Sequence, residues 1–260
     1  MLILLHTSKT MRKPLAGKRE LTEPVLQKQA VKIVSYIRTL SVDDLARAMK
    51  ITPKLAFQVQ EQFANWGVNP AGRYAAVDAF LGDIYSGLQV QSWTNDDRAY
   101  AQDHLRILSG LYGILRHLDA VYPYRLEMGY RFKDSSLKNM YSHWADTIAQ
   151  ELPSDDLIID LTAAEYSKVV LPYITGKTIV RPRFLTRSPK TGVPTFVVVH
   201  AKIARGAFAA WLIRSKITSM KEVSSFNNLG YHYDAASSTP TVPVFICDTF
   251  GGLGLSVRLS

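Results

Sequence analysis

The chain has almost no cysteine, because Cys247 is the only one among its 260 residues. A single cysteine cannot form an internal disulfide, which excludes a disulfide-stabilised extracellular scaffold and fits a reducing compartment. Cys247 ends the apolar run Val244–Cys247. Such a position is typical of a buried thiol, so we expect it to be structural rather than reactive.

Long hydrophobic runs are also absent. No apolar stretch approaches the roughly 20 residues that a membrane-spanning helix needs. The opening residues 1–10 hold an apolar run too short for a secretory signal, without a basic segment before it. The composition, with 47% hydrophobic and 20% charged residues, is that of a globular protein. We therefore expect a cytoplasmic monomer with no membrane partner, folded as a single domain over residues 1–260.

Several catalytic and cofactor-binding patterns are missing. The six histidines, at positions 6, 104, 117, 143, 200 and 232, show no HxxxH or HExxH spacing. There is no Gly-Lys-Ser/Thr phosphate loop and no strand that runs into GxGxxG. No Gly-x-Ser-x-Gly elbow surrounds a serine nucleophile. We therefore expect neither a metal nor a cofactor.

Positive charge is concentrated at the two ends of the chain. The formal net charge is +9, with +7 in residues 1–60, +7 in residues 181–260 and −5 between them. Two basic ends around an acidic middle could face each other across a cleft and bind a polyanion. The alternative is that both are solvated faces that only keep the protein soluble.

Hydrophobic periodicity and turn residues predict interspersed strands and helices. The predicted strands cover residues 2–5, 157–161, 177–185, 195–200, 231–233 and 242–247. The predicted helices cover residues 24–40, 42–50, 53–66, 73–80, 96–109, 140–152, 203–216 and 219–226. Because the two types do not alternate strictly, we expect an α+β (mixed α/β) fold with a mixed sheet, surrounding helices and an N-terminal helical lobe over residues 23–66.

A basic corner is predicted inside this lobe. Thr52 and Pro53 mark a helix start directly after the preceding helix, so two short helices meet at residues 50–52. The corner resembles a helix-hairpin-helix without its usual glycines, and it could offer backbone N–H groups to a DNA phosphate. Arg47, Lys50, Thr52 and Lys54 are the candidate DNA-binding residues. The alternative is an ordinary surface corner between two helices.

The segment Leu105–Gly129 places three arginines, Asp119 and Glu127 among leucines, glycines and tyrosines. The arginines are Arg106, Arg116 and Arg125. Arginine grips phosphate and carboxylate groups better than lysine does, which suggests a partly buried binding site. The alternative is a core helix in which the arginines pair with Asp119 and Glu127.

The same segment carries a family resemblance. Leu105–Gly113 followed by Pro123–Gly129 resembles the central motif of the YaaA peroxide-stress family. Further motifs that resemble the family occur in order along nearly the whole chain. They are Phe80–Leu88, Lys138–Trp144, Glu165–Lys168, Ala201–Gly206 and Gly230–Tyr231.

The resemblance implies one compact fold with a positively charged cleft, and a DNA-binding protein that limits peroxide stress and iron-driven oxidative damage. The chain also departs from the family pattern. The first strand runs into His6-Thr7-Ser8-Lys9-Thr10 where the family has Ser-Pro-Ala-Lys-Thr, and residues 250–260 have no counterpart that we can place. We interpret the chain as a divergent member.

Two functional hypotheses follow. The first is the DNA-binding protein; the second is an enzyme that acts on a nucleobase, nucleoside or related small metabolite in a polar, positively charged cleft. For an enzyme, Glu127 or Asp160 is the candidate general base and Lys9 the anion stabiliser. The candidate cleft residues are Lys9, Arg106, Tyr112, Arg116, Tyr124, Arg125, Glu165, Lys168, His200, Lys202 and Arg205. Lys202 and Arg205 are expected in the first turn of the predicted helix 203–216, where cations oppose the helix dipole and so suggest an anionic partner.

Overall fold

The central sheet is built around β1, whose residues Leu2–Leu5 are apolar and fully buried. A strand that is apolar on both faces is typical of a parallel sheet covered by helices on each side. The computed structural model, which describes residues 1–12, 20–132, 137 and 139–252, has this arrangement. The strand order is β6-β5-β1-β8-β9. The strands are β1 (Leu2–His6), β5 (Leu105–Ser109), β6 (Gly113–Leu115), β8 (Leu157–Asp160) and β9 (Thr178–Val180).

The strand directions make this sheet mixed. β1 pairs in parallel with β5 on one side and with β8 on the other, and β9 continues in parallel beyond β8. The edge strand β6 runs antiparallel to β5. The carboxyl ends of β1, β5 and β8 therefore meet at one edge of the sheet.

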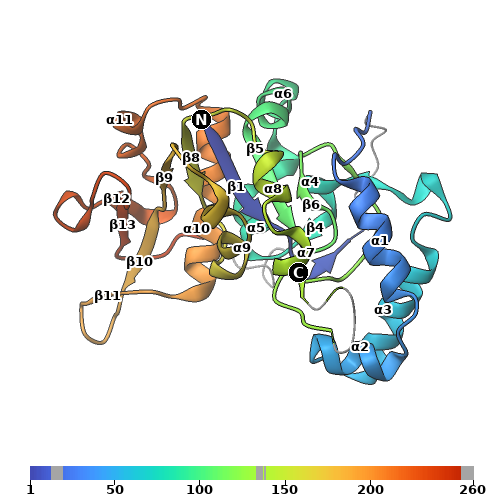
Figure 1. Cartoon of the computed structure of the whole chain (residues 1–260). Helices are drawn as coiled ribbons and strands as arrows, with labels where there is room; N and C mark the ends of the chain where they lie inside the picture. The colour runs from blue at the N-terminus through green and yellow to red at the C-terminus, as the bar shows by residue number, and fades with distance from the viewer. Residues whose placement is uncertain (13–19, 133–136, 138, 253–260) are drawn as a thin grey trace.

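A second mixed sheet stands at one end of the molecule, where the chain is coloured orange to red (Figure 1). Its order is β11-β10-β13-β12, with β10 and β13 parallel and the outer pairs antiparallel. The strands are β10 (Arg183–Arg187), β11 (Pro194–Thr195), β12 (Tyr231–Tyr233) and β13 (Val244–Cys247). Two further sheets have two antiparallel strands each. One pairs β2 (Thr10–Met11) with β4 (Phe80–Leu81), and the other pairs β3 (Tyr74–Ala75) with β7 (Ala120–Val121).

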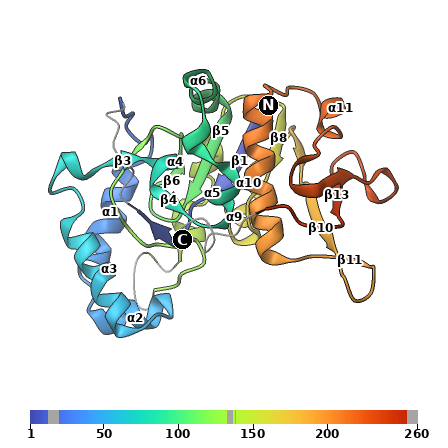
Figure 2. The ribbon, with the colours of Figure 1, turned by 180° about the vertical axis from the view of Figure 1, so that it is seen from behind.

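Helices cover both faces of the central sheet. One face carries α7 (Met140–Trp144), α8 (Thr147–Gln150) and α9 (Ala164–Val170), in front of the sheet in Figure 1. Seen from behind, the other face carries α4 (Ala76–Ala79), α5 (Asp83–Leu88) and α10 (Val198–Arg214) (Figure 2). α6 (Asn95–His104) leads into β5, and α11 (Met220–Val223) lies beside the second sheet. The α+β fold class predicted from the sequence is confirmed.

The N-terminal helices form the end of the molecule opposite to the second sheet (Figure 1). They are α1 (Gln27–Ile37), α2 (Val42–Met49) and α3 (Pro53–Asn65). Ser41 and Asp44 form a capping box at the start of α2, and Thr52 caps α3 ahead of Pro53. These caps are the local signals from which the sequence predicted both helix starts.

The prediction of a helix over residues 96–109 is wrong for residues 105–109. α6 ends at His104, and Leu105–Ser109 forms β5. The backbone of this segment pairs with β1 over four residues, and this long-range pairing overrides the local helical pattern. The arginines of this region therefore do not lie along one helix.

The predicted strand over residues 195–200 is also wrong beyond Thr195, because α10 begins at Val198. Lys202 and Arg205 consequently lie beyond the first turn of α10, and the argument from the helix dipole does not apply to them. The predicted helix over 140–152 is broken at Ala145, whose φ of 42° ends α7. Lys138, which opens one of the family-like motifs, and residues 253–260 of the tail lie outside the described residues.

Candidate functional site

A pocket of about 310 Å³ lies beyond the carboxyl end of β1, the strand whose two neighbours in the sheet are β5 and β8. From β1 the chain adds β5 on one side, and it later adds β8 on the other. In open α/β sheets, ligands bind outside the carboxyl ends of the strands at such a switch point. We call this the switch-point pocket. Its lining includes His6, Thr7, Ser8, Lys9, Asp83, Tyr85, Glu127, Ala163, Glu165 and Lys202.

Glu127 is the buried carboxyl group of this pocket. Its side chain is 8% exposed, and Oε2 lies 3.8 Å from Nζ of Lys9. Oε1 accepts a hydrogen bond from the Tyr166 hydroxyl at 3.5 Å. Burial and the neighbouring Glu165 raise the pKa of Glu127 from 4.5 to about 7, although Lys9 and Arg125 lower it. Near neutral pH, Glu127 can therefore accept or donate a proton, as a general base or acid requires.

Gly110 lets the backbone beside Glu127 pack closely against the end of β5. A Cβ at this position would lie 2.4 Å from the carbonyl oxygen of Leu126, so only glycine permits this approach. The neighbouring Ser109 hydroxyl lies 2.6 Å from the Tyr124 hydroxyl. The Ser-Gly pair at the end of β5 thus positions residues 124–127 and is not a nucleophile motif.

His6 contributes a neutral hydrogen-bond donor. Its Nδ1 accepts from the backbone N–H of Ala163 at 3.2 Å, so the proton of the neutral ring is on Nε2. Burial, together with Arg205 and Lys202, lowers the pKa of His6 to about 3. The ring stacks on Tyr166 with centroids 4.7 Å apart. His6 is therefore uncharged at neutral pH and is a weak base.

The tyrosine beneath the pocket is also held in its neutral form. The hydroxyl groups of Tyr166 and Thr7 lie 3.2 Å apart. Burial and the nearby Glu127 raise the pKa of Tyr166 well above its usual value. Glu127 is thus the buried group of this cluster that changes charge near neutral pH.

Asp160, the other candidate base, lies in a separate polar network. Oδ2 is 2.9 Å from Nε of Arg181 and accepts a hydrogen bond from Ser167 at 2.8 Å. Oδ1 accepts from the backbone N–H and the hydroxyl of Thr162, at 3.0 and 2.6 Å. These four contacts occupy the carboxylate and order the turn from β8 into α9.

A second pocket, of about 420 Å³, adjoins the first and shares Lys9, Glu127 and Glu165 with it. We call it the corner pocket, because Arg47 and Lys50 at the end of α2 line it. Its remaining lining is Ala48, Met49, Gly129, Tyr130 and Arg131. The basic corner between α2 and α3 therefore lies next to the candidate catalytic group.

The other corner residues have distinct local roles. Lys50 adopts the left-handed conformation that ends α2, with φ of 52°. The Thr52 hydroxyl accepts from the backbone N–H of Leu55 at 3.4 Å, so it caps α3. Lys54 is exposed in the first turn of α3.

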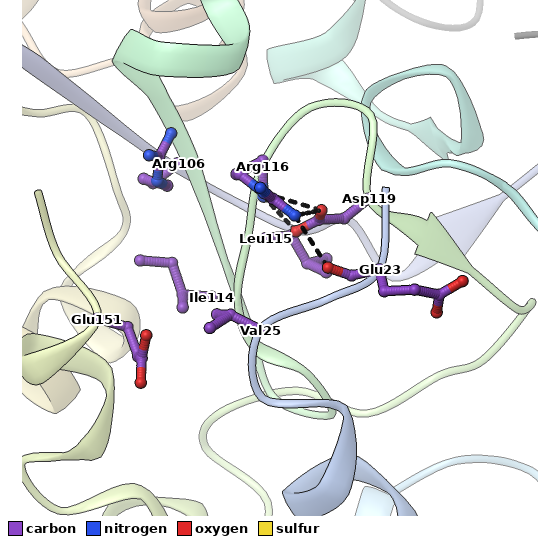
Figure 3. A pocket seen from close by; sticks show the side chains of 8 residues that line it. All are labelled: Glu23, Val25, Arg106, Ile114, Leu115, Arg116, Asp119 and Glu151. Atoms are coloured by element: carbon purple, nitrogen blue, oxygen red, sulfur yellow. Dashed lines mark hydrogen bonds and ion pairs between the residues drawn. The ribbon is translucent and has the colours of Figure 1, made fainter. Parts of the chain in front are cut away.

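Arg106 and Arg116 lie away from both pockets. They line a third pocket, of about 350 Å³, beside the edge strand β6 (Figure 3). Arg116 pairs with Asp119 at 2.9 Å, and Nη1 of Arg106 donates to three carbonyl groups around the end of α6. Arg106 is opposite Leu4 near the start of β5, whereas the switch-point pocket lies beyond the strand's other end.

The remaining predicted cleft residues are dispersed, with two exceptions. Lys202 lines the switch-point pocket, and Arg125 donates to the backbone carbonyl of Lys9 at 3.2 Å. Tyr112, Tyr124, Lys168, His200 and Arg205 do not line either pocket. Tyr112 and Tyr124 are buried in the core, Lys168 is exposed on α9, Arg205 is half-buried on α10, and His200 stacks on Phe250 beside the second sheet.

The sequence did not single out His6, Thr7 or Tyr166 as site residues. A usable signal existed for the first two, since they follow the buried strand at residues 2–5, where α/β sheets place ligands. Tyr166 had no such signal beyond its place in the Glu165–Lys168 motif, because its contact with Glu127 spans 39 residues.

Comparison with known proteins agrees with the family-like motifs. The family described as peroxide stress protein YaaA matches residues 1–237. A UPF0246 protein of Salinispora tropica is 50% identical over 258 residues, which cover 99% of this chain and 98% of that relative. The chain belongs to the YaaA peroxide stress protein family.

Two of the YaaA-like motifs meet in this structure. A Cβ on Gly87 would lie 1.9 Å from the Ile203 carbonyl oxygen, and one on Gly206 would lie 1.8 Å from that of Ile84. The two glycines therefore let α5 and α10 touch backbone to backbone. This contact brings Lys202 of α10 to the switch-point pocket, which residues 83–85 of α5 also line.

The cysteine of this YaaA-family chain is buried in the structure. Cys247, the only cysteine, is fully buried, as the sequence predicted, and its thiol donates to the Leu229 carbonyl at 3.6 Å. Burial and Asp248 raise its pKa, which disfavours the reactive thiolate. In the part of the chain that the structure describes, no His, Cys, Asp or Glu cluster could hold a metal, and no helix could span a membrane.

Proposed function

We propose that this YaaA-family protein binds DNA at the corner between α2 and α3 and at the corner pocket beside it. One observation carries the proposal: Arg47 and Lys50 open onto a pocket that also holds Lys9. With Arg131, four cations from three separate parts of the chain thus line one pocket, which Glu127 and Glu165 also line. Lys54 extends this surface at the start of α3. Such clusters bind the phosphate backbone and release its counterions.

The charge distribution supports this assignment. Residues 1–60, which include the whole corner, carry a formal charge of +7. Phosphate contacts by lysine and arginine position a protein on DNA without reading its sequence. By occupying DNA, the protein would limit the oxidative damage that peroxide and iron cause, which is the role that its family suggests.

The test is fluorescence anisotropy with a labelled 30-mer duplex, and with the same strands carrying a bubble, at two salt concentrations. The variant exchanges Lys50→Glu and Lys54→Glu, and the control exchanges Lys216→Glu and Lys221→Glu, two exposed lysines near α11. Both double variants change the net charge equally. We expect the corner variant to reduce the slope of log affinity against log salt by about 1.8, at about 0.9 for each lost phosphate contact.

The control separates a specific surface from general charge. It should bind DNA like the parent protein. Equal affinity losses in both variants would show that only the net charge acts, and an unchanged corner variant would remove the corner from the interface.

A second candidate function is an enzyme that acts on a nucleobase, nucleoside or related small metabolite. The specific observation is Glu127, which lies beside Lys9 in a pocket at the switch point and has a pKa near 7. Thermal unfolding with nucleobases and nucleotides tests this candidate. We expect a compound that raises Tm for the parent protein but not for Glu127→Ala or Lys9→Ala. An unchanged Tm with every compound would oppose it.

A further inference from the structure

The surface proposed to bind DNA adjoins the switch-point pocket. The corner pocket and the switch-point pocket share Lys9, Glu127 and Glu165, so these residues lie between them. A nucleic acid held by Arg47 and Lys50 therefore has a polar cavity beside it. Proteins that act on single bases use such cavities to hold a base taken out of the stack.

The shared residues offer an acceptor and a donor next to each other. Glu127 has one oxygen 3.8 Å from Nζ of Lys9, and the other receives a hydrogen bond from Tyr166. A carboxylate accepts from a ring N–H, and an ammonium group donates to a carbonyl. Adjacent N–H and C=O groups on a ligand would satisfy both.

His6 and Lys202 are two further donor residues of the pocket lining. Nε2 of His6 carries a proton because Nδ1 is the acceptor for Ala163, and Lys202 reaches the pocket from α10. The pocket is thus lined by two lysines and a neutral imidazole together with the acidic residues Asp83, Glu127 and Glu165. This lining suits a neutral, polar ring that has both donors and acceptors better than it suits a bare anion.

We propose that the switch-point pocket binds a nucleobase with a lactam edge, such as guanine, through N–H donation to Glu127 and C=O acceptance from Lys9. Adenine lacks this edge, since its ring nitrogen accepts where that of guanine donates. The inference rests on the proposed DNA binding for its preferred source, an unpaired base in DNA. A free nucleoside has the same edge and is the other source.

The experiment measures anisotropy with labelled 30-mer duplexes that carry one central bulged nucleotide: guanine, hypoxanthine, adenine or an abasic site. Isothermal titration calorimetry with guanosine and adenosine forms the second arm. The variants are Glu127→Leu, which removes both acceptor oxygens at a similar size, and Glu151→Leu, a control in the third pocket. Urea unfolding verifies that both variants fold.

We expect guanine and hypoxanthine bulges to bind about tenfold more tightly than adenine and abasic bulges, which is the discrimination that one well-placed base contact gives. Glu127→Leu should lose this preference, and Glu151→Leu should keep it. Guanosine binding that depends on Glu127, without a bulge preference, supports the pocket and assigns it to a free nucleoside.

The failures are distinguishable. Equal affinity for all bulges together with no guanosine binding overturns the base pocket, while salt-dependent duplex binding would leave the DNA-binding proposal intact. A preference that survives in Glu127→Leu likewise overturns the assignment of the N–H acceptor. Absence of any DNA binding refutes the proposed function, and guanosine binding would then still support the pocket.

Discussion

The free energy of unfolding of Glu127→Gln, measured relative to that of the parent protein, should increase as the pH rises. The pKa of Glu127 rises from 4.5 to about 7 on folding because the side chain is buried and Glu165 is nearby. The folded protein therefore holds this proton over a pH range in which the unfolded chain has released it. In the parent, the protonated Glu127 contributes to the free energy of unfolding, and this contribution is lost as the pH rises from 4.5 to 7. Gln does not titrate, so the variant does not lose it.

The magnitude follows from the shift. A displacement of about 2.5 pKa units corresponds to about 3.4 kcal/mol for ionising the buried group, at 1.36 kcal/mol per unit. Between pH 5 and pH 8, linkage gives a change of about 2.5 kcal/mol in the difference between the two proteins. Part of the total has already developed at pH 5, and the change is complete a little above pH 7.

Urea unfolding of both proteins at pH 5, 6, 7 and 8 measures this difference. Comparing the variant with the parent at each pH cancels the other titrating groups, provided that the urea m-values agree. A difference that stays constant within about 0.5 kcal/mol, or that changes in the opposite direction, would refute a buried carboxyl group with a raised pKa.

Two further substitutions test the framework of the site. Gly206→Ala should lower the free energy of unfolding, measured by urea denaturation, by about 3 kcal/mol, because its Cβ would overlap a backbone carbonyl of α5. Gly72→Ala is the control: its Cβ would meet no atom within 4 Å, so the free energy of unfolding should change little. Asp160→Ala should cost about 2 kcal/mol, since buried hydrogen bonds are lost but Arg181 is half exposed and can be hydrated. Asp248→Ala, which removes an exposed ion pair with Arg187, is the control and should cost less. Equal stability of the two variants would contradict a structural role for Asp160.

The helical corner was predictable because its signals are local. Ser41 and Thr52 are N-cap residues, Pro53 is a first-turn proline, and the apolar spacing between them is helical. Each signal acts within one or two turns, so the sequence carries it without reference to the rest of the fold. The same holds for the strand at residues 2–5 and for the buried position of Cys247.

The arginine-rich segment shows where local reasoning fails. Leu105–Ser109 became a strand because its backbone pairs with β1, about a hundred residues earlier in the chain. The parallel direction of β5 then fixed Arg106 near the start of the strand, away from the edge that carries the pocket. The residues of this segment that lie at the switch-point pocket or pack against it are Glu127 and the glycine at position 110, not Arg106 and Arg116.

By itself, the sequence determined the fold class, the basic corner and the family, since these depend on periodicity, capping residues and motifs that lie within short segments. Only the tertiary structure decided which charged residues meet. Lys9 and Glu127 are far apart along the chain, and the sheet brings Nζ and Oε2 within 3.8 Å. The raised pKa of Glu127 arises from burial by segments from all over the chain, and the free energy of that burial depends on three-dimensional contacts that no local pattern encodes.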